Sequence, residues 1–394
     1  MRLNLGCGDL LLDGYVNLDG KRGDEIYPLL APDGMVLYQE GSVDEIRASH
    51  ILEHFGHREI PDVLADWVRA LKPGGKLKIA VPDFEAISRA YLSGVQMPTE
   101  GFVMGGQVDE RDFHKAIFDM DSLRDLMRAA GLRSICKWES DAPDCSSYAI
   151  SLNLEGIKRR PLTKEDVKAL NVSCVMSVPR LGFMDNFFCM FRALAPMGIP
   201  FKKLTGAFWG QCLEHGMQTC LDEGREWILT ADYDSVFTQD ALRDLLELAR
   251  DTDADALVPI QAHRTKATPL MTMCDEEGMP MRSAPIDAFH PEITKVTTAH
   301  FGLTLIRASA LRDIPNPWFW SHPGDGGKWG DGRIDDDISF WRKWREYGKT
   351  LYLANHVTIG HAELMVRWPS KNFQAMYQHP SEFEKSGKPE GVWI

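Results

Sequence analysis

The chain has 394 residues, of which 44% are hydrophobic and 26% are charged, as is typical of a soluble globular protein with two or three domains. Its formal net charge of −13 at pH 7 opposes broad binding to a nucleic-acid backbone, since such binding usually requires a basic surface. No apolar run approaches the roughly 20 residues of a membrane-spanning helix, no signal peptide precedes the first strand, and the cysteines lack paired spacings. We therefore expect a cytoplasmic protein with reduced thiols.

The chain begins with a strand at residues 3–5 that runs directly into a glycine-rich turn made of Gly6, Cys7 and Gly8. Glycine at such a turn lets the backbone approach a ligand closely and adopt dihedral angles that other residues avoid. A second short strand, at residues 15–18, ends in Asp19, whose carboxylate is placed to hold the hydroxyl groups of a ribose. The pattern predicts a ligand site at this turn.

Three further elements follow in the first part of the chain. Residues 46–51 read as a strand that enters a turn, and residues 65–71 as a helix stopped by Lys72-Pro73-Gly74-Gly75 before another strand. Residues 122–132 have the pattern of an amphipathic helix. Together with the glycine turn and the acid after the second strand, this series resembles the class I S-adenosylmethionine-dependent methyltransferases from residue 1 to about residue 150.

The resemblance implies a Rossmann-like fold that binds S-adenosylmethionine, with the cofactor held by Gly6, Cys7, Gly8 and Asp19. Residues 9–14 depart from the family, because they are too short for the long helix that usually follows the glycine turn. A methyltransferase-like domain that serves as a scaffold or binds a partner is the alternative.

The segment His50-Ile51-Leu52-Glu53-His54 also fits the H-x-x-E-H spelling of a zinc peptidase. A peptidase site would need these residues within a long helix and a third ligand from elsewhere. The predicted strand and turn disfavour that interpretation.

A charged segment broken by Pro161 separates the two halves of the chain and contains the basic cluster Lys158-Arg159-Arg160. Such segments commonly mark domain boundaries. We therefore expect an amino-terminal domain at residues 1–157, a linker at 158–165 and a carboxy-terminal domain at 166–394.

The second half begins with a strand at residues 172–178, followed by Pro179 and Arg180, and continues with helical patterns at 184–194 and 211–223. Its most informative stretch is the apolar strand before Asp232-Tyr233-Asp234, after which a helix begins. Open α/β sheets bind ligands at the carboxyl ends of their strands. Two carboxylates there can share a divalent cation that also contacts the phosphates of a substrate.

Four later features complete the pattern of this half. Residues 298–307 read as a strand that contains Gly302, and an aromatic loop precedes Trp329. Asp335, Asp336 and Asp337 stand at a helix start, where three acids exceed what capping requires. Residues 349–361 read as a strand, a turn and a second strand that ends in His361, with His356 in the turn.

These elements resemble the GT-A glycosyltransferases over residues 170–365. The resemblance implies a divalent metal held by Asp232, Asp234 and His361, with His356 as the competing histidine. It also implies donor contacts from Pro179, Arg180 and Asp232, and acceptor contacts near Gly302 and Trp329. In inverting members one carboxylate deprotonates the acceptor, which leaves Asp335, Asp336 and Asp337 as candidates. Ile334 stands where the inverting pattern has a glutamate, and Asp336 is favoured because it lies near the middle of both alignments of the run.

We therefore expect two doubly wound α/β domains, a Rossmann-like methyltransferase fold and a GT-A fold. The predicted function is an inverting transfer that uses Mn²⁺ or Mg²⁺ and a UDP- or GDP-sugar, with a hydroxyl acceptor. Three alternatives stay open: glycosylation of a modified nucleic-acid base, a methyltransferase with an accessory sugar-binding domain, and a binding module without catalysis. The acidic charge disfavours the first and the dense carboxylate and histidine set disfavours the last.

Overall fold

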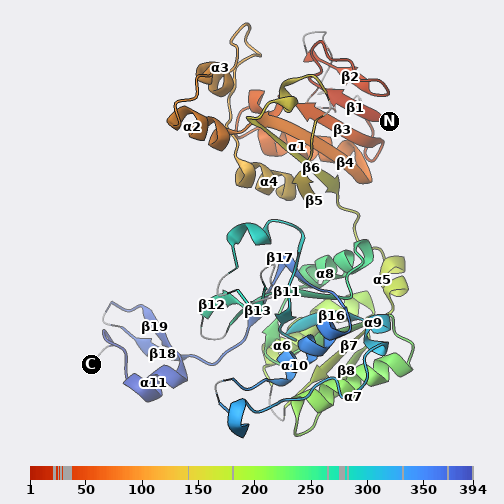
Figure 1. Ribbon diagram of the computed structural model, residues 1–394, viewed down its shortest axis with the longest axis vertical. Helices are drawn as coiled ribbons and strands as arrows, with labels where there is room; N and C mark the ends of the chain where they lie inside the picture. Colours follow the sequence, from red (N-terminus) through yellow and green to blue (C-terminus); the bar gives the residue numbers. More distant parts are fainter. Residues whose placement is uncertain are drawn as a thin grey trace. The chain divides into compact units, whose positions relative to one another are not determined.

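The computed structural model describes residues 1–20, 24, 26, 29, 38–140, 142–179, 182–263, 266–274, 280–281, 284–330, 332–370 and 372–392. The chain divides into two compact units, Met1–Pro161 (the amino-terminal unit) and Leu162–Ile394 (the carboxy-terminal unit), coloured red to olive and green to blue in Figure 1. The predicted α/β class is confirmed in both. Within these ranges, no helix has the length and apolar character needed to cross a membrane.

The amino-terminal unit is built on a six-stranded sheet with the order β2-β1-β3-β4-β6-β5. Its strands are β1 (Arg2–Leu5), β2 (Val16–Leu18), β3 (Val43–Ser49), β4 (Leu71–Pro82), β5 (Leu132–Lys137) and β6 (Ser151–Lys158). The first four strands run parallel to one another, whereas β6 runs antiparallel to both β4 and β5. Parallel pairing of β1 with β2 and β3 brings the ends of these strands to one edge of the sheet.

Helices and short 3-10 turns connect these strands: η2 (Leu52–His54), α1 (Ile60–Ala70), α2 (Phe84–Leu92), α3 (Thr99–Met104), α4 (Met120–Ala129) and η3 (Cys145–Ser147). Helix α1 buries Val63, Leu64 and Trp67 in the core of the unit. Helix α1 ends at Ala70, and the predicted stop sequence that follows it forms a bulge at the start of β4. Leu71 pairs with Val43 and Lys76 pairs with Glu45, so the register between β3 and β4 shifts across the bulge. The sheet therefore absorbs the Lys-Pro-Gly-Gly sequence inside a strand.

The carboxy-terminal unit is built on a nine-stranded sheet with the main order β10-β17-β11-β16-β9-β7-β8, while β12 pairs with β11 and β14 with β17. The strands are β7 (Val172–Ser177), β8 (Phe201–Leu204), β9 (Trp227–Ala231), β10 (Ser235–Val236), β11 (Ala256–His263), β12 (Lys266–Pro269), β14 (Ile293–Lys295), β16 (Leu303–Arg307) and β17 (Leu351–His361).

Helices cover both faces of this sheet. Leu229 packs in one hydrophobic cluster with α6 (Met184–Leu194) and α8 (Gln239–Asp251), whereas its neighbour Ile228 packs in another with α7 (Trp209–Asp222) and α10 (Asp336–Glu346). Because successive side chains of a strand point to opposite faces, the two clusters must lie on opposite sides of the sheet. The unit is therefore doubly wound, as predicted.

The remaining elements are smaller: α5 (Lys164–Leu170), η4 (Ala195–Met197), β13 (Met271–Thr272), η5 (Ile286–Phe289), β15 (Thr298–Ala299), α9 (Ala308–Arg312), η6 (Asp325–Gly327), β18 (Val366–Pro369), β19 (Ala375–Gln378) and α11 (Pro380–Ser386). Strands β18 and β19 form a separate hairpin beside α11 near the end of the chain (Figure 1). Residues 300–302 divide the predicted strand 298–307 into β15 and β16.

The prediction of two strands joined by a turn at residues 349–361 is wrong, because β17 is a single strand. Its pairing with β11 shifts between Ala354, opposite Pro259, and Thr358, opposite Ile260, so that residues 355–357 bulge out of this ladder. Asn355, in the bulge, donates its amide to the carbonyl of Pro291 at 2.8 Å. A buried polar residue within an apolar run has the sequence signature of a turn, but here tertiary hydrogen bonds keep the strand continuous.

Candidate functional site

Asp232 and Asp234 lie in a tight turn directly after the buried strand β9. The amide of Ser235 donates to the carbonyl of Asp232 at 3.2 Å and closes the turn. Asn186 of α6 is 2% exposed and donates its side-chain amide to the carbonyls of Asp232 and Ser235 at 2.9 and 2.6 Å. Because a buried amide ties both ends of the turn together, its conformation is fixed by the fold itself.

We expect the Asn186→Leu variant to lose roughly 1–3 kcal/mol of unfolding free energy, because two buried carbonyls lose their donor while side-chain volume is kept. Urea denaturation measures this loss, and Mn²⁺ calorimetry should show weaker binding to the loosened turn. Asn355→Leu is the matched control, since Asn355 is 7% exposed and donates to Pro291 and to Thr294. A similar loss of stability with unchanged Mn²⁺ affinity is expected there, and equal losses of affinity in both variants would contradict a local role for Asn186.

His361 is brought to Asp234 by strand pairing. Strand β10 places Ser235 opposite His361, and the amide of Ala362 donates to the carbonyl of Asp234 at 2.6 Å. The Nδ1 of His361 lies 3.3 Å from the carbonyl of Ala262, which can only accept, so Nδ1 carries a proton. The Nε2 then faces the Asp234 Oδ2 at 3.3 Å. Two lone-pair-bearing atoms at this distance need a cation or a proton between them.

Asp232 lies beside this pair but is held by another partner. The indole Nε1 of Trp209, on α7, donates to the Asp232 Oδ1 at 3.1 Å. Burial raises the pKa of Asp232 to about 6, although the hydrogen bond from Trp209 opposes the shift, and the charge of Asp234 adds to it. Excess negative charge is therefore concentrated at the end of β9, where a cation would relieve it.

The three acids at the start of α10 have different surroundings. Asp335 is the N-cap residue and forms an exposed ion pair with Arg333 at 2.7 Å. The hydroxyl of Ser321 donates to Asp336, whose carboxylate also fills the space that a side chain would take at Gly210. Burial raises the pKa of Asp337, opposed by the hydrogen bond from the Ile338 amide. The negative charge of Asp337 also contributes to the raised pKa of Asp232, and both residues line the same cavity.

A cavity of about 710 Å³ joins these groups, and its size is within the range of small-molecule sites. Its lining includes Trp209, Asp232, Gln261, His263, Met271, Thr272, His300, Phe301, Ser321, Asp335, Asp336, Asp337 and His361. Asp234 lies behind this surface with 4% of its area exposed. Acids from β9 and α10 and a histidine from β17, far apart in the sequence, thus meet at one hollow.

Gly302 and Trp329 are placed differently from the other predicted residues. A Cβ atom at Gly302 would lie 2.5 Å from the Oε1 of Gln261 and 2.7 Å from the Oγ of Ser235, so this glycine makes room for buried side chains. Neither Gly302 nor Trp329 lines the cavity, and Trp329 is 65% exposed on the loop before α10.

Pro179 and His356 are also absent from the cavity lining. Pro179 is exposed after β7, and His356 lies in the bulge of β17 and not in a turn. Arg180 lies outside the described residues.

Sequence reasoning missed the contributions of Trp209 and His300. His300 is 8% exposed and lines the cavity, its Nε2 donates to the carbonyl of Pro259 at 2.8 Å, and its Nδ1 accepts from the amide of Gly302 at 3.0 Å. Burial lowers the pKa of His300 to about 4, so the ring is neutral at pH 7. The sequence does show a histidine two positions before Gly302, which could have pointed to His300 as a site residue. Trp209 stands at a helix start, and no local feature of the sequence points to its contact with Asp232.

The predicted cofactor residues of the amino-terminal unit are brought together by the pairing of Leu5 with Leu18. Gly6 and Gly8 have positive φ angles of 65° and 53°, and the amide of Gly8 donates to the Asp19 Oδ2 at 2.7 Å. Cys7 lies between them and is 6% exposed. A side chain at Gly8 would meet nothing within 4 Å, so open space adjoins this backbone. S-adenosylmethionine binding by these residues stays a prediction, which calorimetric titration tests.

No protein-family model matches the sequence, and no curated protein matches it. Among solved structures, A197 from STIV is 14% identical to the chain, with 52% of this chain and 94% of that one covered and a TM-score of 0.36. GalNAc-T7 with UDP, GalNAc and Mn²⁺ is 11% identical, and the match covers 49% of this chain and 44% of that one with a TM-score of 0.35. A SAM-dependent methyltransferase from Archaeoglobus fulgidus is 12% identical, and the match covers 40% of this chain and 85% of that one with a TM-score of 0.24. Each of these proteins is similar to only a part of the chain.

Proposed function

We propose that the carboxy-terminal unit is a metal-dependent glycosyltransferase that moves a sugar from a UDP- or GDP-sugar to a hydroxyl acceptor with inversion. The proposal depends above all on one observation, the 3.3 Å approach of His361 Nε2 to Asp234 Oδ2 at the end of a buried strand. A separation of this size is expected for two ligands of one metal ion with bonds of about 2.1 Å. The pair adjoins a cavity with room for a nucleotide sugar or part of one.

The donor atoms suit Mn²⁺ better than Mg²⁺, since an imidazole nitrogen stands beside carboxylate oxygens. We propose that Asp234 and His361 hold the ion, and that Asp232 joins them through the oxygen that Trp209 does not occupy. The Ala262 carbonyl holds the His361 ring in the orientation that presents Nε2. A bound ion would neutralise charge on the departing diphosphate.

The catalytic base in this proposal is Asp337. The sequence favours Asp336, but the Asp336 carboxylate already accepts the hydroxyl of Ser321 and packs against Gly210. Asp337 lines the same cavity as Asp232 and has a pKa that burial raises. A base with a raised pKa takes a proton from a hydroxyl more readily at neutral pH. Asp336 then positions the start of α10, and Asp335 remains at the surface.

The test is a transfer assay of the full chain against UDP- and GDP-sugars with Mn²⁺, using sugar, nucleoside and DNA hydroxyl acceptors. We expect Mn²⁺-dependent release of UDP or GDP from one donor, stopped by EDTA and restored by added Mn²⁺. Binding of a nucleotide sugar without release of UDP or GDP from any donor would favour the binding-module alternative. Product formation only with a modified nucleic-acid base would favour the base-modification alternative.

A further inference from the structure

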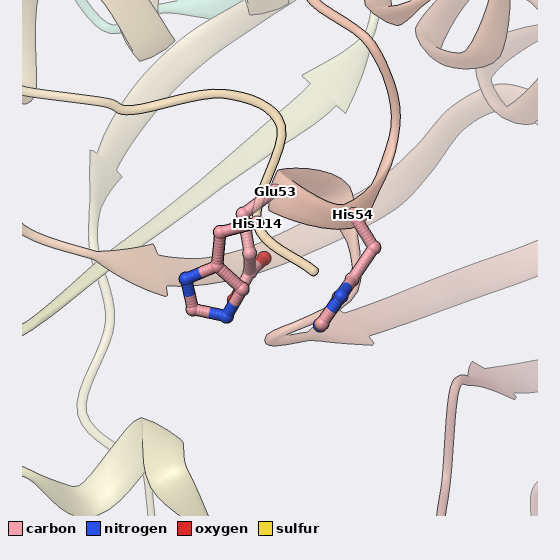
Figure 2. Close-up of side chains that lie close together, drawn as sticks. All are labelled: Glu53, His54 and His114. Atoms are coloured by element: carbon pink, nitrogen blue, oxygen red, sulfur yellow. The ribbon is translucent and has the colours of Figure 1, made fainter. Parts of the chain in front are cut away.

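A second cluster of metal-binding side chains lies in the amino-terminal unit, outside the site described above. Within the part of the chain that the structure describes, one group of His, Cys, Asp or Glu has its ligand atoms all within 4.8 Å of one another: Glu53, His54 and His114. Figure 2 shows the Glu53 carboxyl and the two imidazole rings turned toward a common point. The centres of the two rings are 4.9 Å apart, with planes at 83°.

Glu53 is the unusual member of this cluster. Its side chain is 0% exposed, and neither carboxylate oxygen has a hydrogen-bond partner among the residues that the structure describes. The Nδ1 of His50 lies 3.2 Å from the Glu53 Oε1, a distance that meets the ion-pair criterion, but the groups are not aligned for a hydrogen bond. A bound cation offsets the desolvation cost of a buried carboxylate that lacks hydrogen bonds.

The two histidines present nitrogen atoms to this carboxylate. The Nδ1 of His54 is buried and, within the described part of the chain, has no hydrogen-bond partner. The Nδ1 of His114 lies 3.0 Å from the carbonyl of Phe102, which can only accept, so the ring carries its proton there and leaves Nε2 as a lone pair. A carbonyl that fixes the outer nitrogen of a histidine is the usual support of a metal ligand.

Backbone hydrogen bonds hold the two segments of this cluster together. The carbonyl of Glu53, in η2, accepts the amides of Lys115 and Ala116 at 2.7 and 3.3 Å. The amide of His114 donates to the carbonyl of Met104 at 3.1 Å. His114 is therefore set beside Glu53 by both of its neighbouring segments, although 61 positions separate the two in the sequence (114 − 53). A site whose ligands are fixed by backbone contacts loses little conformational entropy when it binds.

A cavity of about 410 Å³ borders His114, with His57, Met104, Lys115 and Ser122 also in its lining. It gives an ion a path to His114 and leaves room for a water molecule or substrate atom as a further ligand.

We propose that Glu53, His54 and His114 bind a divalent transition metal of the Zn²⁺ class. One carboxylate and two imidazoles are a common ligand set for such ions, with an open fourth position. Ligands of a tetrahedral ion with bonds of about 2.0 Å are roughly 3.3 Å apart, so closing the present cluster requires side-chain movements on the order of 1 Å. His50, bonded through Nε2 to Ser151 Oγ at 2.9 Å, orients the Glu53 carboxylate from outside. This site is independent of the proposed glycosyltransferase site.

Co²⁺ titration of the full chain tests the proposal, because the visible absorption of bound Co²⁺ reports tetrahedral coordination. We expect one such band per chain that added Zn²⁺ removes, and about a hundredfold or greater loss of Co²⁺ affinity in Glu53→Gln and in His114→Ala. Asp234→Ala should keep the band, which separates this site from the one on β9. His215→Ala is the matched control, since His215 is an exposed histidine on α7 that lines neither cavity, and it should also keep the band.

X-ray absorption at the zinc edge supplies a measurement that does not depend on the variants. The Zn²⁺-loaded chain should show two imidazole ligands and first-shell oxygen. The proposal is overturned if the Co²⁺ band is absent, if it persists unchanged in a folded Glu53→Gln protein, or if the zinc spectrum shows sulfur or no imidazole. Circular dichroism of each variant confirms that it is folded.

Discussion

The Asp234→Ala variant should lose metal-dependent glycosyl transfer by about a thousandfold or more, because several kcal/mol of transition-state stabilisation depend on the ion. Asp234 is 4% exposed and its Oδ2 lies 3.3 Å from His361 Nε2. Removing its carboxylate takes away one of the three groups that would share the cation. Steady-state release of UDP or GDP with Mn²⁺ measures the loss, and Mn²⁺ calorimetry should show weaker binding in parallel.

Asp240→Ala is the matched control for this variant. Asp240 lies in the first turn of the next helix, is exposed, and pairs with Arg243 at 2.9 Å. Surface pairs of this kind contribute little to stability, so transfer and Mn²⁺ affinity should both stay near those of the parent protein. Transfer by Asp234→Ala at the parent rate, with or without EDTA, would end the proposal of a metal site at β9.

The Asp337→Asn variant should lose about a hundredfold to ten-thousandfold in kcat and keep donor and metal binding. The amide has the shape of the carboxylate but cannot take the proton of the acceptor hydroxyl. Asp335→Asn is expected to act like the parent protein, because Asp335 is an exposed N-cap that pairs with Arg333. Asp336→Asn should have an intermediate effect through its contacts with Ser321 and the start of α10.

The pH dependence separates a base from a residue that only positions the helix. Burial raises the pKa of Asp337 above its ordinary value of 3.8, so transfer should fall as the pH drops through a pKa higher than that of a free aspartate. The Asp337→Asn variant should lack this acid limb, whereas Asp336→Asn should retain it. A retained limb in Asp337→Asn together with its loss in Asp336→Asn would return the role of base to Asp336. Retention of the anomeric configuration, seen by NMR of the first product formed, would exclude the inverting mechanism.

Local patterns in the sequence were sufficient to predict several elements. The helix at 184–194 has the predicted bounds, and the buried strand before Asp232 ends where the carboxylates begin. Both depend on apolar periodicity and on a change to polar residues, which neighbouring positions determine. The acids at the start of α10 were equally visible, because a helix start attracts carboxylates.

The partners of these acids could not be predicted, because long-range packing selects them. Trp209 reaches Asp232 from a different helix, and Ser321 reaches Asp336 from the loop before α10. The cluster at Glu53 has the same origin: the sequence placed Glu53 and His54 in a turn, but His114 joins them only because Lys115 and Ala116 bond to the Glu53 carbonyl. A search for closely spaced ligands in the sequence cannot find a histidine 60 residues away from His54 (114 − 54).

The position of His361 opposite β10 depends on the number of residues between the bulge of β17 and the end of the strand. Beyond the bulge, Thr358 is opposite Ile260, and His361 is opposite Ser235 of β10. One residue inserted after Thr358 would bring Gly360 to that position, and one residue deleted would bring Ala362, and neither side chain can bind a metal. If His361 binds the proposed metal, related sequences should vary in identity along β17 far more readily than they gain or lose a position after the bulge.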